Sequence, residues 1–374
     1  MRDNRLDVIR GLAILLLTMT HTVPGPALMA AYGHYYPKFG LFFHGADIFV
    51  AYSGLVCGMV YLRTIRRDGA TEGIRKGLIR AAQLFVYNAA ACILVLMLLW
   101  GFGAAGIRPE LHVLDRPLIE AAIGTILLFD PIEYFNILNY YIVMLAVLPF
   151  FVMAQMRARW PIVLSAAIYV LYTARQLATG QTGEIGTFFV SPLAWQFLFF
   201  GGVTVGMNYD RIRASLPPLS RTIGPIMLYL LVSHFMREQA WVVHNFAEKY
   251  DLGFLRIVDL VLISYVIDRL VRPDVRIEAR PLQVVASLGS NSLFLFAVSL
   301  VLCYAASNLL IVLDGSRAAY LAVILAEIAL MMWLGRMLMR NPGLRALTQL
   351  GWMDRMTRWM TGGGRTLDGA PAGG

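Results

Sequence analysis

Residues 5–21 read RLDVIRGLAILLLTMTH, a stretch that starts polar, turns apolar after Gly11 and ends on a histidine. Residues eleven apart return to nearly the same face of an α-helix, so Arg10 and His21 share a stripe and lie about 16 Å apart along the axis. Asp7 belongs to the same stripe, because it precedes Arg10 by three residues. We expect the rest of the chain to be organised around this helix.

A polar stripe on a membrane helix must face protein or water, because an unpaired polar group in hydrocarbon costs several kcal/mol. An ionisable group at membrane depth is by default a functional-site hypothesis. The alternative is that Asp7 and Arg10 only anchor the helix at the interface and that His21 is a packed polar residue. We favour the functional interpretation.

The composition is that of a polytopic membrane protein. Of the 374 residues, 58% are hydrophobic and only 15% are charged, and the mean hydropathy is +0.64. Soluble domains average about 45–50% apolar and about 25% charged residues. The net charge of +9 does not indicate nucleic acid, because the basic residues lie in short loops between apolar runs.

Cysteine usage and the N-terminus add two expectations. Cys57, Cys92 and Cys303 all lie inside apolar runs, so we expect neither a disulfide framework nor a metal site. No small-residue cleavage site closes the first apolar run, so we expect no cleaved signal peptide.

Ten apolar runs could cross about 30 Å of hydrocarbon, and we therefore predict an all-α protein with about ten transmembrane helices. The runs cover residues 8–24, 41–62, 78–102, 136–155, 160–177, 190–207, 222–236, 253–270, 282–304 and 318–339. Alternating the loops between the two faces puts three quarters of the 32 Lys and Arg residues on the face of both termini. The positive-inside rule then predicts that both termini are cytoplasmic.

The regions outside these runs are assigned as follows. The segment DRPLIEAAIGTILLF at 115–129 is apolar but short, and we interpret it as an interfacial or re-entrant helix in the longest outer loop. Residues 1–340 form the predicted ten-helix transmembrane domain and residues 341–374 a cytoplasmic tail. The tail is expected to be disordered after about residue 361, because its Gly-rich end has too little apolar surface to order itself.

The second run contains GADIFVAYSG at 45–54, with Asp47 in the outer half of the predicted span. One interpretation is that Asp47 marks the outer interface and that Gly54 permits close helix packing. The functional interpretation pairs Asp47 with His21, because a carboxylate on one imidazole nitrogen fixes the tautomer and raises the basicity of the other. The sequence leaves this pairing open.

Several of these segments together resemble the acyltransferase-3 superfamily and, within it, the OpgC family, which succinylates osmoregulated periplasmic glucans. Asp7, Arg10, Gly11 and His21 resemble the superfamily's first-helix motif, and residues 45–54 its second-helix motif. The segments similar to the OpgC family are RDNRLDVIRG at 2–11, FDPIEYFNILNYYIVMLAVLP at 129–149, SPLAWQFLFFGG at 191–202 and LGSNSLFLFAVSL at 288–300. The similarity is looser at 222–280 and in the tail.

The resemblance implies a multi-pass enzyme of the bacterial inner membrane. It would take a succinyl or acetyl group from a cytoplasmic acyl-CoA and pass it to a hydroxyl of a periplasmic or exported glycan. His21 would be the catalytic histidine, and Arg10, with Asp7 and Arg5, would lie near the donor. The partners would be lipid, glycan and acyl-CoA as a substrate, with no bound cofactor and no nucleic acid.

The chemistry of the residues agrees with this expectation. Transfer from a thioester to an alcohol needs a base for the hydroxyl proton and a group that stabilises the oxyanion. A neutral imidazole at His21 can be that base, and guanidinium groups bind phosphates such as those of coenzyme A. The basic loop 63–80 adds positive charge, although it can equally be a plain orientation signal.

Other polar residues within apolar runs are weaker candidates for acceptor-binding or supporting roles. Ser53 lies at mid-membrane, and Gln196, beside Trp195, could bond a glycan hydroxyl or merely bridge two helices. Glu327 is the most deeply embedded carboxylate by sequence, and is either functional or paired with a polar partner. The main rival function is a transporter or flippase for a glycan or glycolipid; another is a non-catalytic partner in polymer export, in which His21 would be dispensable.

Overall fold

The computed structural model describes residues 3–23, 42–105, 118–126, 134–180, 191–272, 277–313 and 316–353. Over these residues the regular structure is entirely helical, which confirms the predicted all-α class. The helices are α1 (Asn4–His21), α3 (Gly45–Asp68), α4 (Ala70–Ala104), α5 (Leu118–Ile126), α6 (Asn136–Arg157), α7 (Trp160–Thr179), α8 (Pro192–Met207), α9 (Tyr209–Ser215), α10 (Leu219–Met236), α11 (Ala240–Phe246), α12 (Phe254–Leu270), α13 (Arg280–Ser290), α14 (Ser292–Val312), α15 (Arg317–Arg340) and α16 (Pro342–Thr348).

Seven of these helices, α3, α4, α6, α7, α10, α14 and α15, are long and apolar enough to cross a membrane, so the chain is a multi-pass membrane protein. Two other predicted crossings correspond to shorter helices, α8 with 16 residues and α12 with 17. The predicted run 282–304 is divided into two helices, because the chain breaks at Asn291 between α13 and α14. The count of ten crossings therefore stays a prediction, as does the side of the membrane on which each terminus lies.

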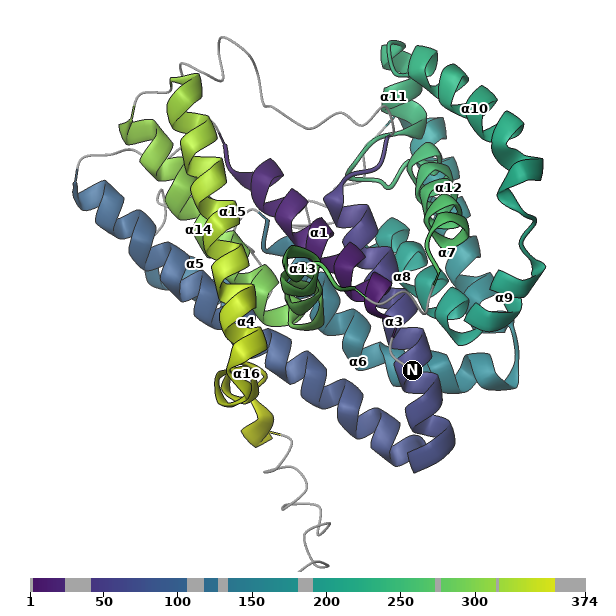
Figure 1. The fold of residues 1–374 in the computed structure, drawn as a ribbon, viewed down its shortest axis with the longest axis horizontal. Helices are drawn as coiled ribbons and strands as arrows, with labels where there is room; N and C mark the ends of the chain where they lie inside the picture. Colours follow the sequence, from purple (N-terminus) through teal and green to yellow (C-terminus); the bar gives the residue numbers. More distant parts are fainter. Residues whose placement is uncertain are drawn as a thin grey trace, which may run out of the picture.

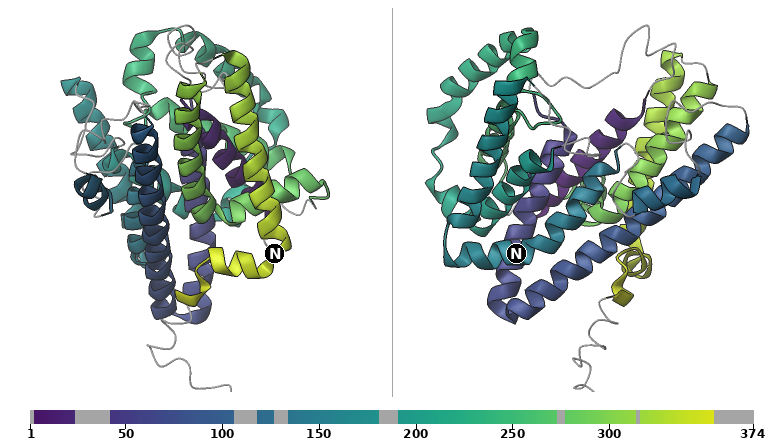
Figure 2. Two further views of the ribbon diagram at one scale, coloured as in Figure 1. Left: turned by 90° about the vertical axis from the view of Figure 1, so that its left-hand side faces the viewer. Right: turned by 180° about the vertical axis from the view of Figure 1, so that it is seen from behind.

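Helix α1 lies in the middle of the bundle, as Figure 1 shows, and packs against α3, α13, α14 and α15. Its Leu17, Ala13 and Ile14 are buried, as expected for the apolar part of the first run. The long helix α4 lies along one side of the bundle, beside α6 and α14 (Figure 2). The predicted helix within 115–129 is present as α5, which packs on α4; its residues 115–117 and 127–129 lie outside the described part of the chain.

Helices α3 and α8 cross with their backbones almost in contact, because both carry glycines at the crossing. A Cβ atom added to Gly54 would lie 2.2 Å from the Phe199 carbonyl oxygen, and one added to Gly202 would lie 2.3 Å from the Ala51 carbonyl oxygen. Helices in a bilayer associate through close packing, with no hydrophobic drive between them, and small residues permit that approach. The interpretation of Gly54 as a packing residue is therefore correct for this helix pair.

Helix α12 is joined to the body of the bundle by charged side chains. Near its start, Arg256 donates to the Asp47 carboxylate of α3 at 2.5 Å, and both side chains are buried. Near its end, Asp268 receives hydrogen bonds from Tyr209 and Arg213. Helix α12 thus contacts its neighbours firmly at its two ends.

Replacing Gly202 by Ala should destabilise the protein, because the added methyl group meets the Ala51 backbone. Overpacking of this kind costs about 1–3 kcal/mol. The neighbouring Gly201 is the matched control, since a Cβ there meets no heavy atom within 4 Å. Thermal unfolding in detergent should show a lower melting temperature for Gly202→Ala and no loss for Gly201→Ala; equal melting temperatures would contradict the close crossing.

Candidate functional site

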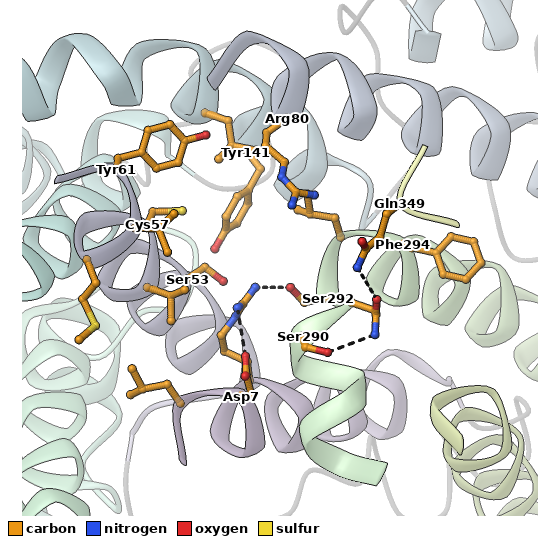
Figure 3. Close-up of a pocket in the computed structure, with 18 of the residues that line it drawn as sticks. Asp7, Ser53, Cys57, Tyr61, Arg80, Tyr141, Ser290, Ser292, Phe294 and Gln349 are labelled. Carbon is orange, nitrogen blue, oxygen red and sulfur yellow. Dashed lines mark hydrogen bonds and ion pairs between the residues drawn. The ribbon is translucent and has the colours of Figure 1, made fainter. Parts of the chain in front are cut away.

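A cavity of about 640 Å³ opens among α1, α3, α4, α6 and the start of α14, as Figure 3 shows. We call it the arginine cavity, because four arginines line it against two aspartates. Its charged lining residues are Arg10, Arg63, Arg80, Arg345, Asp3 and Asp7. The excess of positive charge suits an anionic ligand, and guanidinium groups are well shaped to bind phosphate in two-point contacts.

Arg10 is held at the wall of this cavity by two neighbours. Its guanidinium donates to the Ser292 hydroxyl and lies 3.9 Å from the Asp7 carboxylate. Ser292 is the first residue of α14, so the break between α13 and α14 supplies this partner. Asp7 and Arg10, which the spacing predicted to share one stripe, thus form an ion pair that lies against a cavity.

A buried phenol, Tyr61, lies at the wall of the arginine cavity. Tyr61 is buried, with 6% of its surface exposed, and its hydroxyl has no hydrogen-bond partner among the described residues. Most buried polar groups in proteins have a partner, so an unsatisfied one requires an explanation. Tyr141 and Ser53 line the same cavity (Figure 3), and Tyr141 donates to the Phe49 carbonyl oxygen at 3.3 Å.

The C-terminal end of the described chain closes one wall of the cavity. Gln349 donates its side-chain amide to Asn291 at 2.9 Å, and its backbone oxygen accepts from Gln83 at 2.8 Å. Tyr87 donates to the Thr348 carbonyl oxygen. Residues 342–349, which the sequence analysis placed in the tail, therefore pack on the helical bundle and contribute to the site. The part of the tail expected to be disordered lies outside the described residues.

His21 lies at the other end of α1, beyond the arginine cavity. Its ring stacks on Tyr134 with centroids 4.4 Å apart, and Tyr134 in turn lies 6.2 Å from Tyr304. The next residue, Thr22, is fully buried and donates to the Glu327 carboxylate at 2.8 Å. Glu327 thus has the polar partner that the sequence left unnamed, and it ties α15 to the end of α1 beside His21.

Asp47 forms a buried ion pair with Arg256, a partner that could not be identified from the sequence. Its Oδ2 accepts from Arg256 at 2.5 Å and from the His44 backbone amide at 2.7 Å. Breaking a buried ion pair by removing one partner typically costs about 3–5 kcal/mol, so these contacts give Asp47 a structural role. Its predicted pairing with His21 and its catalytic role stay predictions.

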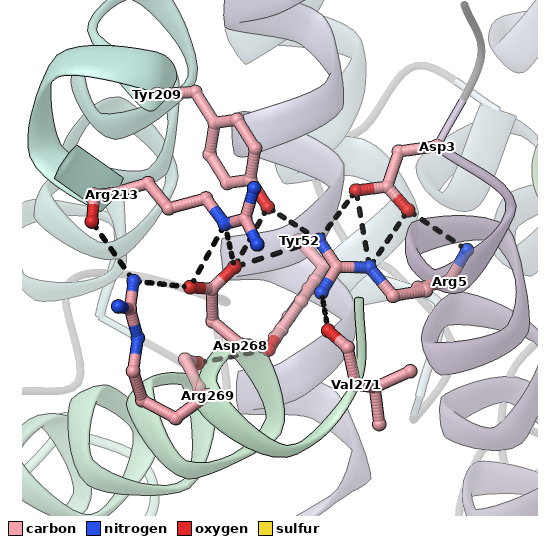
Figure 4. A network of polar contacts seen from close by, with 9 residues as sticks. Asp3, Arg5, Tyr52, Tyr209, Arg213, Asp268, Arg269 and Val271 are labelled. Atoms are coloured by element: carbon pink, nitrogen blue, oxygen red, sulfur yellow. Dashed lines mark hydrogen bonds and ion pairs between the residues drawn. The ribbon is translucent and has the colours of Figure 1, made fainter. Parts of the chain in front are cut away.

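Arg5 is not among the residues that line the arginine cavity; it belongs to a second polar cluster (Figure 4), which Asp3 joins to that cavity. Its guanidinium bonds the Asp3 carboxylate at 2.8 Å and the Tyr209 hydroxyl at 2.8 Å, and it also donates to the Val271 carbonyl oxygen. Burial raises the pKa of Tyr209 to about 12, so its hydroxyl stays protonated and donates to Asp268. The structure therefore does not bring Arg5 together with Arg10, although both belong to α1.

Trp195 and Gln196 lie in contacts between helices. The buried Trp195 indole donates to the Tyr250 carbonyl oxygen at 3.1 Å. Gln196 accepts from the Ser165 hydroxyl at 2.5 Å and donates to the Ser165 carbonyl oxygen at 2.8 Å. Gln196 thus bridges α8 and α7, as the simpler of the two interpretations expected.

Sequence reasoning missed several residues of the arginine cavity. Ser292 and Asn291 lie within the LGSNSL segment at 288–293, and Arg80 ends the basic loop 63–80, so the sequence singles out both segments but not these residues. Tyr61, Arg345 and Gln349 carried no local signal. They become visible as site residues only when the fold places them around one cavity.

The fold and site define a multi-pass membrane protein with a basic cavity beside its first helix. The family model described as OpgC protein matches residues 2–342. The chain belongs to the OpgC family, as its motifs indicated. No curated protein and no solved structure matches the chain.

If the Tyr61 hydroxyl serves a ligand, Tyr61→Phe should leave stability unchanged and weaken ligand binding. The control is Tyr52→Phe, which removes a hydroxyl bonded to Ser264 at 3.0 Å. A hydrogen bond contributes about 0.5–1.5 kcal/mol, so only the control should lower the melting temperature. Binding of a non-transferable acyl-CoA analogue should weaken several-fold in Tyr61→Phe alone, and unchanged binding would contradict the role.

Proposed function

We propose that this protein is a membrane O-acyltransferase that moves a succinyl or acetyl group from a cytoplasmic acyl-CoA to a hydroxyl of a periplasmic or exported glycan. Membership of the OpgC family supports a glucan-modifying transferase of this type. The observation that carries the proposal is the arrangement of α1, with Arg10 at the wall of a basic cavity and His21 eleven residues further along the same helix. An anionic donor and a proton-transfer group are thereby held on one rigid element.

In this proposal the arginine cavity receives the coenzyme A end of the donor. The phosphates of coenzyme A are bound by Arg80, Arg63 and Arg345, and Arg10 contacts the donor deeper in the cavity. The pantetheine arm then runs along α1, because it must span the roughly 16 Å between the levels of Arg10 and His21 to bring the thioester to His21. Neither substrate is required to cross the membrane whole.

His21 acts as the general base in the transfer step. Its imidazole takes the proton of the glycan hydroxyl while that oxygen attacks the thioester carbonyl carbon. A new C–O bond forms, the C–S bond breaks, and the coenzyme A thiolate leaves and takes up a proton. Tyr134 stacks against the imidazole and Glu327 fixes Thr22 beside it, so both residues position the base.

The proposed orientation puts both termini and the 63–80 loop in the cytoplasm, where acyl-CoA is present. The asymmetry of basic residues supports this orientation, which belongs to a multi-pass protein of the bacterial inner membrane. The arginine cavity would then open to the cytoplasm and the His21 end of α1 would lie toward the glycan. A transporter has no need of this pairing of a basic cavity with a histidine.

Replacing His21 by Ala should abolish acyl transfer while leaving the fold intact. A positioned base contributes roughly 10²–10⁴-fold to a rate, so the loss should be at least 100-fold. His21→Gln should be equally inactive, because an amide can hydrogen-bond but cannot take up the proton. The measurement is mass spectrometry of glycans incubated with purified protein and acyl-CoA; near-normal activity of well-folded His21→Ala protein would contradict the proposal.

Arg10→Ala should weaken donor binding by at least about tenfold, because hydrogen bonds to charged groups contribute about 1.5–3 kcal/mol. Arg10→Lys should recover only part of the affinity, since an ammonium cannot make the planar two-point contact. Arg66→Ala is the matched control, because Arg66 is exposed on α3 and lies outside the cavity lining. Titration with the acyl-CoA analogue gives the result, and unchanged affinity in Arg10→Ala would exclude Arg10 from the donor site.

A further inference from the structure

A second cavity, of about 370 Å³, lies among α1, α3, α8, α9 and α12, and its walls are almost entirely apolar. We call it the α12 cavity. Ile9, Leu55, Leu198, Val205 and Ile257 are among its lining residues. The hydroxyls in this wall have protein partners. Tyr52 donates to Ser264 at 3.0 Å, and Ser264 donates to the Leu260 carbonyl oxygen at 2.6 Å. Tyr209 and Tyr265 donate to Asp268 and to the Pro217 carbonyl oxygen. Water would find few hydrogen-bond partners in this cavity, whereas a hydrocarbon chain would make favourable apolar contacts with its walls.

The length of the α12 cavity matches one leaflet of a bilayer. It follows α12 from Ile257 to Asp268, which is about 16 Å at 1.5 Å per residue, and half of the hydrocarbon core is about 15 Å. Between the ends of α12, which Arg256 and Asp268 hold to the bundle, the cavity separates part of the helix from α3 and α8, although Tyr52 of α3 still reaches Ser264. Val261 in this wall is 64% exposed, so the cavity is open along α12.

One end of the α12 cavity is charged, and its charge is positive. Arg5, Arg213 and Arg269 face Asp3 and Asp268 there, which leaves one positive charge in excess (Figure 4). Arg213 binds Asp268 through Nε at 3.1 Å, which leaves its two terminal nitrogens without a hydrogen bond to the described residues. Arg213 is also the most exposed of the three arginines, at 36%. An anionic group at the open end of the cavity would meet this guanidinium first.

We propose that the α12 cavity binds one acyl chain of an anionic phospholipid, with the lipid phosphodiester against Arg213. The chain fills the space between α12 and the α3–α8 pair, and the phosphate balances the excess charge of the cluster. Basic pockets between membrane helices on the cytoplasmic side bind anionic headgroups through this chemistry. The site shares Leu6 with the wall of the arginine cavity, but it uses neither Arg10 nor His21, so it does not rest on the acyl-transfer proposal.

The test compares two glycine variants that differ only in where the new side chain lies. A Cβ added to Gly201, which lines the α12 cavity, meets no heavy atom within 4 Å, so Gly201→Leu fills the cavity without a backbone clash. Gly224→Leu on α10 is the control, because its Cβ is equally free and the residue lies outside the cavity lining. Purified, delipidated protein is titrated with phosphatidylglycerol or phosphatidylcholine and observed by native mass spectrometry.

The wild-type protein and Gly224→Leu should retain one phosphatidylglycerol at least tenfold more tightly than phosphatidylcholine, and Gly201→Leu should lose this molecule. Arg213→Gln should still bind lipid but lose the preference for the anionic headgroup. This second variant tests the proposal even if Gly201→Leu folds poorly. Equal retention by Gly201→Leu and Gly224→Leu would show surface lipid only and overturn the proposal. Equal affinity of the wild-type protein for phosphatidylglycerol and phosphatidylcholine would overturn it as well.

Discussion

The close crossing of α1 and α13 is the contact on which the arginine cavity depends. A Cβ atom at Gly289 would lie 1.8 Å from the Asp7 carbonyl oxygen, and one at Gly11 would lie 2.0 Å from the Val285 carbonyl oxygen. Only glycines at both positions let the two backbones approach this closely. Because α13 ends at Ser290, one residue after Gly289, the crossing places Ser292 beside Arg10 and so sets the direction of that guanidinium.

Pairing of buried charge is the second constraint, and it determines how α12 is attached. A charged side chain within a bilayer must face the bundle and find a partner. Arg256 meets Asp47 near one end of α12, and Arg5 and Arg213 meet Asp268 near the other. These pairs join distant parts of the chain, and the α12 cavity lies between them, where Tyr52 of α3 still reaches Ser264 of α12 at 3.0 Å.

The sequence predicted what depends on local pattern. Hydropathy gave the all-α class, and the three-residue and eleven-residue spacings placed Asp7, Arg10 and His21 on one helix. It could not predict that Asp47 would meet Arg256, because the two residues are 209 positions apart and many carboxylates and arginines were available. The role of Gln349 was missed for the same reason. The break at Asn291 was missed because apolar residues flank GSNS at 289–292 on both sides, and a hydropathy window spans so short an interruption.

The most direct test of this account is transfer across a membrane of defined orientation. The protein is reconstituted into vesicles with all copies facing one way. Isotope-labelled acyl-CoA is then supplied on one face of the membrane and a neutral glucan on the other. The account predicts labelled glucan only when acyl-CoA is on the face that carries the 63–80 loop and the glucan is on the opposite face. Glucan that crosses the membrane without being acylated, or transfer that requires both substrates on one face, would contradict it.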